Sequence, residues 1–171
     1  MRIELAQCIL RSWRRDDALQ LAEAGNNRNI WIRVRDRMPH PYTLADTQAY
    51  LERVLADESA VVACIEVKGK VGGSIGLHPG QDVYRRTAEL GYWIAESYWG
   101  RGIATAAVCA LVEYGFAKIP LDRIYASAYE NNPASVRVLE KAGFEFEGRM
   151  RKNVIKDGVV LDSLLYAIVQ G

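Results

Sequence analysis

Residues 89–104 constrain the fold of this chain more than any other segment. An apolar and aromatic run at residues 89–95 is typical of a β-strand. A glycine-rich turn at residues 99–104 follows it, and residues 103–117 are mostly apolar and rich in alanine, which predicts a buried helix. A strand, a tight turn and a helix N-terminus together bind anions, because backbone N–H groups and the helix dipole point out of the turn. The segment therefore predicts a phosphate site.

Two common phosphate-binding motifs do not fit this turn. A phosphate loop of the NTPase type requires Lys and Ser or Thr after its last glycine, whereas Gly102 is followed by Ile103 and Ala104. A dinucleotide fingerprint requires Gly-x-Gly-x-x-Gly/Ala, whereas the sixth position counted from Gly100 is Thr105. From the turn alone, a phosphate site of another kind and an ordinary tight turn are both open.

Motifs further along the chain resolve this choice. A predicted strand at residues 123–129 is followed by Asn132 and Ser135, and then by Lys141-Ala142-Gly143-Phe144. The turn and these residues resemble the GCN5-related N-acetyltransferases (GNAT), and most closely the branch that includes the ribosomal-protein N-terminal acetyltransferases. The family's coenzyme loop, Arg/Gln-x-x-Gly-x-Gly/Ala, aligns with the turn, with Trp in place of the first Arg or Gln. The family's Asn-x-x-Ser and Lys-x-Gly-Phe patterns also match, and the resemblance covers essentially all 171 residues.

The resemblance implies a single α/β domain over residues 1–171, with a mixed, mainly antiparallel sheet of about seven strands flanked by about four helices. Hydrophobic patterns place the strands at residues 7–13, 60–67, 71–77, 89–95, 123–129, 144–154 and 159–169. They place the helices at residues 16–25, 43–57, 103–117 and after Asn132. Asp16 is expected to cap the first helix, and Thr43 and Asp46 to form a capping box at the second. Residues 26–42 are expected to be irregular.

The composition of this chain argues against several classes of binding partner. A net charge of +1 lacks the basic excess of nucleic-acid-binding domains, and the longest apolar run, residues 103–112, falls short of the roughly 20 residues that a membrane span needs. Cys8, Cys64 and Cys109 stand far apart without paired or metal-binding spacing, which indicates reduced thiols in a cytoplasmic protein. The sequence thus predicts no nucleic acid, membrane or metal partner, and it leaves monomer and homodimer open.

The resemblance implies acetyl-CoA as the cosubstrate. Its pyrophosphate would lie on the turn, whose residues are Trp99, Gly100, Arg101, Gly102, Ile103 and Ala104. Cations near this turn and on the helix that follows Asn132 are candidates for the coenzyme phosphates. They are Arg101, Arg137 and Lys141, although exposed cations on helices are often only solvated.

The resemblance also assigns a place to the pantetheine arm of the coenzyme. The backbone of Trp93, Ile94 and Ala95 would pair with it and help to polarise the thioester carbonyl. Asn132 and Ser135, one helical turn apart, would face it from the next helix. Asn132 is equally suited to cap that helix, and the two roles are compatible because capping leaves its NH₂ group free.

The reaction that the resemblance implies needs a base and a proton donor. An amine must lose a proton before it attacks the thioester, and the departing thiolate benefits from a hydrogen bond. Glu89, in an otherwise apolar strand, is the candidate base, because burial would make its carboxylate a better proton acceptor. The alternative is a structural carboxylate satisfied by a neighbouring Arg or N–H. His78 is assigned to a surface loop, and Ser135 is the candidate donor to the thiolate.

Residues 28–37 contain four arginines and a tryptophan. In the implied fold, the first two helices and the final hairpin shape the acceptor cleft, so Trp31, Arg33 and Arg35 are candidate substrate-binding residues. A cleft lined in this way favours an acceptor that bears a carboxylate, a phosphate or an acidic peptide over a polyamine. The alternative, that these arginines pair with local acids or are only solvated, stays open.

The function expected from the sequence is acetyl transfer from acetyl-CoA to a primary amine by direct attack in a ternary complex. The acceptor is either a protein or peptide N-terminus or a small-molecule amine. A non-catalytic acyl-CoA-binding module is the alternative, which would keep the glycine turn and Asn132 but would need neither Glu89 nor Ser135.

Overall fold

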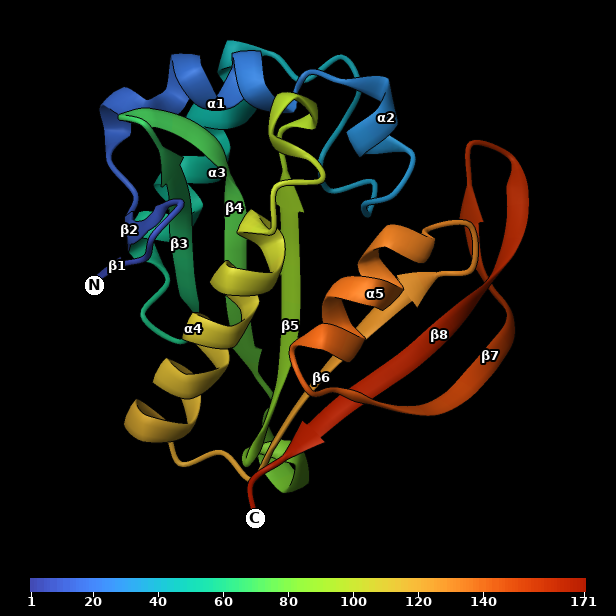
Figure 1. Cartoon of the computed structure of the whole chain (residues 1–171). Coiled ribbons are helices and arrows are strands. Elements are labelled where there is room, and N and C mark those ends of the chain that lie inside the picture. The colour runs from blue at the N-terminus through green and yellow to red at the C-terminus, as the bar shows by residue number, and fades with distance from the viewer.

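The computed structural model describes residues 1–171 as one open sheet of eight strands, covered by helices on both faces (Figure 1). The strand order is β1-β2-β3-β4-β5-β6-β8-β7, and every neighbouring pair is antiparallel except β5 and β6. The strands are β1 (Arg2–Glu4), β2 (Ile9–Ser12), β3 (Val61–Val67), β4 (Lys70–Pro79), β5 (Thr87–Ile94), β6 (Arg123–Tyr129), β7 (Glu145–Lys156) and β8 (Val159–Val169).

Two helical layers bury opposite faces of the sheet. The helices are α1 (Ala18–Gly25), α2 (Arg28–Trp31), α3 (Leu44–Ala56), α4 (Ile103–Lys118) and α5 (Pro133–Lys141). The larger hydrophobic cluster joins α4 and α5 to the sheet, and a smaller cluster joins α1, α2 and α3 to the other face. None of the helices is both long and apolar enough to cross a bilayer.

Local sequence signals explain where the main helices begin. Thr43 and Asp46 form the expected capping box at the start of α3. The Asn132 side chain caps α5, and Pro133 occupies the first turn, where a missing N–H costs nothing. Gly115 allows α4 to approach β4 closely, because a Cβ atom there would lie 2.6 Å from Leu77 Cδ1.

The pair β5 and β6 is the feature that positions the functional site. The two strands pair in parallel over only three residue pairs, from Thr87 with Arg123 to Glu89 with Tyr125, and then diverge (Figure 1). Ala95 N–H donates to Gly72 of β4, and backbone groups alternate in direction along a strand. The backbone groups of residues 90, 92 and 94 therefore face the gap between β5 and β6.

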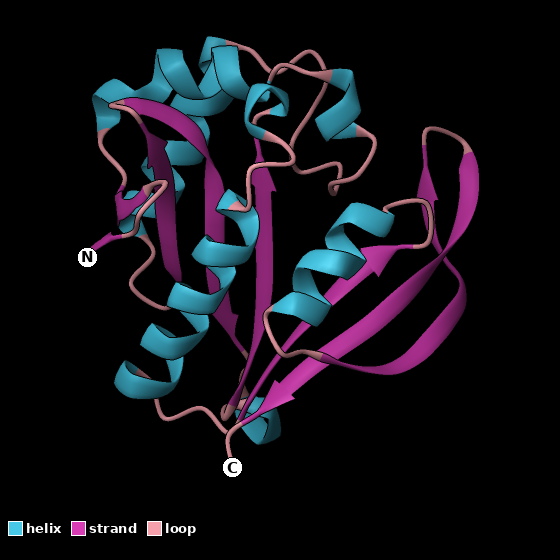
Figure 2. Ribbon diagram, viewed as in Figure 1, coloured by secondary structure: helices cyan, strands magenta, loops and turns pink.

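The structure confirms the fold class and extends it by two short elements (Figure 2). The sheet has eight strands rather than about seven, because the three-residue edge strand β1 was not expected. A four-residue helix, α2, lies in the segment expected to be irregular, where the Asn27 side chain caps it. Asp16 does not cap the first helix. Asp17 precedes α1, but its side chain makes no cap hydrogen bond to this helix. Its carboxylate instead accepts the Arg14 N–H at the short 3-10 turn of Arg15–Asp17.

Candidate active site

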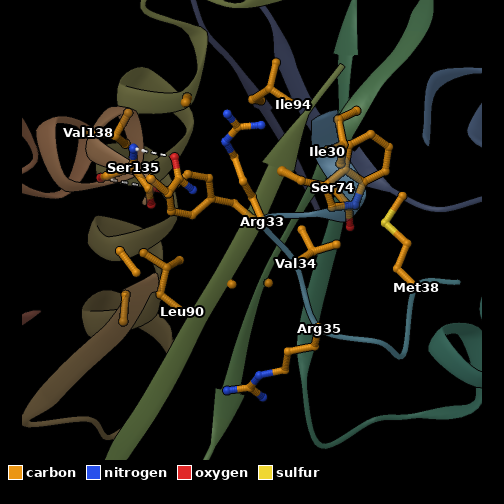
Figure 3. A pocket seen from close by; sticks show the side chains of 18 of the residues that line it. Ile30, Arg33, Val34, Arg35, Met38, Ser74, Leu90, Ile94, Ser135 and Val138 are labelled. Atoms are coloured by element: carbon orange, nitrogen blue, oxygen red, sulfur yellow. Dashed lines mark hydrogen bonds between the residues drawn. The ribbon is translucent and has the colours of Figure 1, made fainter. Parts of the chain in front are cut away.

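A single large cavity of about 1210 Å³ occupies the gap between β5 and β6 (Figure 3). This volume exceeds the roughly 300–1,000 Å³ typical of small-molecule pockets. Its walls come mainly from β4, β5, β6, the N-terminus of α4, α5, α3, β7 and residues 32–43, here named the α2–α3 loop. Because side chains from both faces of β5 line it, the cavity passes through the sheet.

The glycine turn at one end of the cavity is built for an anion. Gly100 and Gly102 have φ values of 72° and 75°, a region that other residues rarely adopt. The first hydrogen bond of α4 runs from Ala106 N–H to Gly102 O, so the three preceding N–H groups, those of residues 103–105, have no backbone acceptor. These donors and the helix dipole fit a phosphate, as the sequence predicts.

Trp99 ties this turn to the end of β5. Its indole Nε1 donates a hydrogen bond to Ile94 O at 2.8 Å. The guanidinium of Arg33 lies 5.5 Å from the centre of the indole ring, within range of a cation–π contact. The tryptophan that replaces the family's usual Arg or Gln thus fixes the turn to the strand and holds Arg33 over the cavity.

The diverging part of β5 offers backbone groups to a ligand, with one correction to the expectation. Trp93 and Ile94 line the cavity, and their role in coenzyme binding stays a prediction. Ala95 does not line it, and its N–H donates to Gly72. The groups that face the gap belong to residues 90, 92 and 94, because the odd-numbered residues are hydrogen-bonded to β4. At residue 94 the N–H is free, whereas the carbonyl already accepts Trp99 Nε1. Gly91 also lines the cavity, and no atom would lie within 4 Å of a Cβ added there.

The start of α5 brings three polar groups together. Asn132 Oδ1 accepts the Ser135 N–H at 3.3 Å, which leaves the amide NH₂ of Asn132 without a protein partner. Ser135 Oγ lies 2.8 Å from the Tyr92 hydroxyl (Figure 3 shows Ser135 in this contact). Burial raises the pKa of Tyr92 to about 12, and the hydrogen bond to Ser135 opposes the rise. Sequence reasoning missed Tyr92, because a tyrosine in an apolar strand is typical of a core position.

Glu89 lies on the opposite face of β5 from Tyr92 and forms an ion pair with Arg35. Its side chain is 24% exposed, and that of Arg35 is 62% exposed. The role of Glu89 as the base stays a prediction. The alternative, a carboxylate satisfied by a neighbouring arginine, describes this structure.

His78 belongs to the cavity rather than to a surface loop. It lies in β4 directly opposite Glu89 in the sheet register, and it lines the cavity beside Glu89. The imidazole folds over Gly76, where a Cβ atom would lie 3.2 Å from His78 Nε2. The side chain keeps contact with solvent, but partial desolvation lowers the pKa of the imidazole, and the charge of Glu89 opposes this. The adjacent Pro79 and Gly80 had indicated a loop.

A family model described as "Acetyltransferase (GNAT) domain" matches residues 7–145. The chain belongs to the GNAT acetyltransferase family. The family expected from the glycine turn and the Asn-x-x-Ser pattern is thereby confirmed.

Individual relatives in the GNAT family share parts or most of this chain. It is 36% identical over 118 residues to "Putative ribosomal N-acetyltransferase YdaF" of Bacillus subtilis (strain 168), covering 69% of this chain and 64% of YdaF. It is 25% identical over 162 residues to spermidine N(1)-acetyltransferase of Escherichia coli (strain K12), covering 94% of this chain and 85% of that protein. Three of the curated relatives, YdaF among them, are matched over only 46% to 64% of their own length.

A solved structure supports the same GNAT fold. Microcin C7 self immunity acetyltransferase MccE, in complex with acetyl-CoA and AMP, is 25% identical to this chain with a TM-score of 0.85. The alignment covers 97% of this chain and 94% of MccE.

The acceptor-side candidates divide into two groups in this GNAT domain. Arg33 and Arg35 line the cavity, and Figure 3 shows them extending from the α2–α3 loop in different directions. Trp31 does not line it. Its ring packs against Lys156 Nζ, which lies 4.0 Å from the ring centre, and neighbouring Arg28 forms an ion pair with Asp157. The aromatic and basic character of residues 28–31 therefore serves the contact with the β7–β8 hairpin.

Cations remain on both sides of the cavity without a carboxylate partner. Arg101, Arg137 and Lys141 line it on the side of α4 and α5, where the glycine turn lies. Arg37 and Arg53 line it on the side of α3, and sequence reasoning did not single out Arg53. No group of three or more His, Cys, Asp or Glu side chains is arranged to hold a metal ion.

Proposed function

We propose that this protein transfers the acetyl group of acetyl-CoA to a primary amine by direct attack. The observation that carries the proposal is the cavity that passes through the sheet between β5 and β6. An anion-binding turn lies at one end, and Glu89 and His78 lie on the other face. Two substrates entering from opposite faces would meet at the free backbone groups of β5.

The coenzyme half of the cavity matches the parts of acetyl-CoA. The N–H groups of residues 103–105 would hold the pyrophosphate, with Arg101, Arg137 and Lys141 near its phosphates. The pantetheine arm contains amides, which pair with the backbone of residues 92 and 94 as a further strand would. The free NH₂ group of Asn132 supplies a donor to the same arm.

The acceptor half supplies the groups that an amine requires. An ammonium bound at Glu89 would pass its proton to the neutral imidazole of His78, directly or through water. The amine would then attack the carbonyl, and N–H groups of β5 in the gap would stabilise the developing oxyanion. One such donor typically contributes about 10²–10³ in rate.

The departing thiolate would receive a hydrogen bond from Ser135. A serine hydroxyl is a weak acid by itself, but the Tyr92 hydroxyl lies 2.8 Å from Ser135 Oγ. Donation from Tyr92 polarises Ser135 as charge develops on sulfur. The two hydroxyls thus form a short relay at the coenzyme side of the gap.

The acceptor is a protein or peptide N-terminus or a small-molecule amine. The name of YdaF points to the first class, and that of the spermidine acetyltransferase points to the second. A polyamine fits this chain poorly, because Arg35, Arg37 and Arg53 outnumber the carboxylates Glu89 and Asp57 on the acceptor side.

Thermal unfolding with different nucleotides tests the coenzyme assignment. Acetyl-CoA should raise the melting temperature, since a ligand selective for the folded state stabilises it, whereas ATP and NAD should have little effect. Equal stabilisation by NAD or ATP would overturn the assignment. A non-catalytic module would bind acetyl-CoA yet release no thiol with any amine.

A further inference from the structure

We propose that the acceptor is zwitterionic at its reacting end, with a carboxylate a few bonds from the amine that is acetylated. The inference rests on the proposed acetyl transfer and adds the chemical class of the acceptor. It is carried by the ion pair between Glu89 and Arg35, which lies within the cavity on the acceptor side.

The two partners of this pair are held differently. Glu89 projects from β5, which pairs with β4 on one side and, at this position, with β6 on the other. Arg35 projects from the α2–α3 loop, and its side chain is 62% exposed. The carboxylate is thus fixed, while the guanidinium can reposition within the cavity mouth. An exposed ion pair adds little to folding stability, so opening this one costs little.

The charges on an acceptor decide how well it binds at the ion pair between Glu89 and Arg35. An ammonium group that binds Glu89 must displace Arg35 or share the carboxylate with it. A simple amine then exchanges one ion pair for another and leaves the guanidinium without a partner. An amine that also carries a carboxylate replaces the single pair by two, because its ammonium binds Glu89 and its carboxylate binds Arg35.

The charged residues around this ion pair also favour an acceptor that carries both an ammonium and a carboxylate group. Arg37 and Arg53 line this side of the cavity without forming an ion pair, so further positive charge is available to the ligand's anion. The remaining carboxylate, that of Asp57, already accepts hydrogen bonds from Ser59 N–H at 2.8 Å and Ser59 Oγ at 2.5 Å. Both of these bonds fall on Oδ1 of Asp57. Glu89, in contrast, projects from β5 at the point where β5 and β6 begin to diverge, so it is the carboxylate placed beside the proposed reaction site.

Two kinds of acceptor carry a carboxylate a few bonds from an amine: free amino acids, and peptides that begin with Asp or Glu. Matched pairs of acceptors distinguish them. One arm compares free amino acids with their C-terminal amides, which keep the amine and lose the carboxylate. The other compares C-terminally amidated peptides that begin with Asp or Glu with those that begin with Asn or Gln. Release of free thiol from acetyl-CoA gives kcat and KM, with spermidine as the polycationic reference.

In at least one arm, we expect kcat/KM to be about tenfold to a hundredfold higher for the carboxylate-bearing member, the range for a charge-assisted hydrogen bond. The arm that shows the difference identifies the source. Amides or spermidine that react as well as the acids would overturn the inference. No thiol release with any acceptor, spermidine included, from a protein that acetyl-CoA stabilises would instead contradict the proposed acetyl transfer.

Variants separate recognition from folding. Arg35→Gln should raise KM for the acidic acceptor about tenfold or more and leave the neutral acceptor unchanged or improved, since Glu89 is then free. Arg28→Gln is the control, because Arg28 is also exposed and ion-paired but lies outside the cavity. An equal loss for both acceptors in Arg35→Gln would assign Arg35 a structural role. A protein that acetyl-CoA does not stabilise would instead contradict the proposed function.

Discussion

At the scale of single residues, the Tyr92–Ser135 pair makes the sharpest prediction. Tyr92→Phe keeps the ring and removes the hydroxyl that touches Ser135 Oγ. We expect kcat to fall by roughly 10- to 1000-fold in this variant and by a similar factor in Ser135→Ala. The reason is that a positioned proton donor typically contributes a factor of about 10²–10⁴ to the rate. Acetyl-CoA affinity, measured by calorimetry, should change little. Tyr84→Phe is the control, since Tyr84 is 68% exposed and lies outside the cavity. Full activity of Tyr92→Phe would restrict Tyr92 to packing.

If His78 is the base, its protonation should set the acidic limb of the pH profile of kcat. An imidazole accepts a proton only in its neutral form, and desolvation lowers the pKa of His78 from its ordinary value near 6.5. The neutral form of His78 therefore predominates at pH 6.5, and protonation of the imidazole increases as the pH falls below its lowered pKa. With saturating acceptor, kcat should fall below about pH 6.5 in the wild type.

In His78→Gln the plateau of kcat should be lower and this acidic fall should disappear. The matched control is His40→Gln, because His40 stacks on Trp31 outside the cavity. An unchanged acidic limb in His78→Gln would exclude His78 as the base.

The residue scale also shows where sequence reasoning ends. Asn132 and Ser135 could be predicted, because a helix cap and its neighbour one turn later are local in sequence. The pairing of Arg35 with Glu89 joins positions 54 residues apart, and no local pattern encodes it. His78 was assigned to a loop because Pro79 follows it, yet β4 extends through Pro79.

At the scale of elements, one substitution, at Gly102, tests whether the start of α4 binds the coenzyme phosphates. Gly102→Val places a β-branched residue at φ 75°, a conformation that costs such a residue roughly 1–2 kcal/mol or more. It also places a side chain where the anion must approach. The rise in melting temperature caused by acetyl-CoA should be lost, while the protein without ligand stays folded.

The control for this change is Gly148→Ala. The φ of Gly148 lies outside the left-handed region, and no atom would lie within 4 Å of its added Cβ. A normal acetyl-CoA response in Gly102→Val would contradict the assignment of the turn to the coenzyme phosphates.

Element prediction succeeded where periodicity is long and failed where elements are short. The strand at Arg123–Tyr129 was predicted with its exact bounds, and α4 to within one residue. The edge strand β1 and helix α2 have three and four residues, too few for a repeat in hydrophobicity to show. Their contacts with β2 and with the β7–β8 hairpin define them instead.

At the scale of the whole molecule, the continuous cavity predicts the kinetic mechanism. Both substrates must be bound together if they meet inside the sheet, so initial-rate plots should intersect. The three cysteines, Cys8, Cys64 and Cys109, do not line the cavity, and no thiol is placed to carry the acetyl group. Parallel plots, or a protein that gains one acetyl group when mixed with acetyl-CoA alone, would indicate a covalent intermediate and contradict direct attack.

The divergence of β5 from β6 gives this molecule an edge strand in the middle of its own sheet. Exposed edges usually recruit other chains, because their unpaired N–H and C=O groups accept any extended backbone. Here α4 and α5 lie on the face of the sheet at this opening (Figure 1). In the proposed function, the amide-containing arm of acetyl-CoA takes the place of a neighbouring strand beside β5. In other sheets, an unpaired strand edge of this kind favours aggregation. Here the same edge would select ligands that are shaped like a single extended strand of peptide.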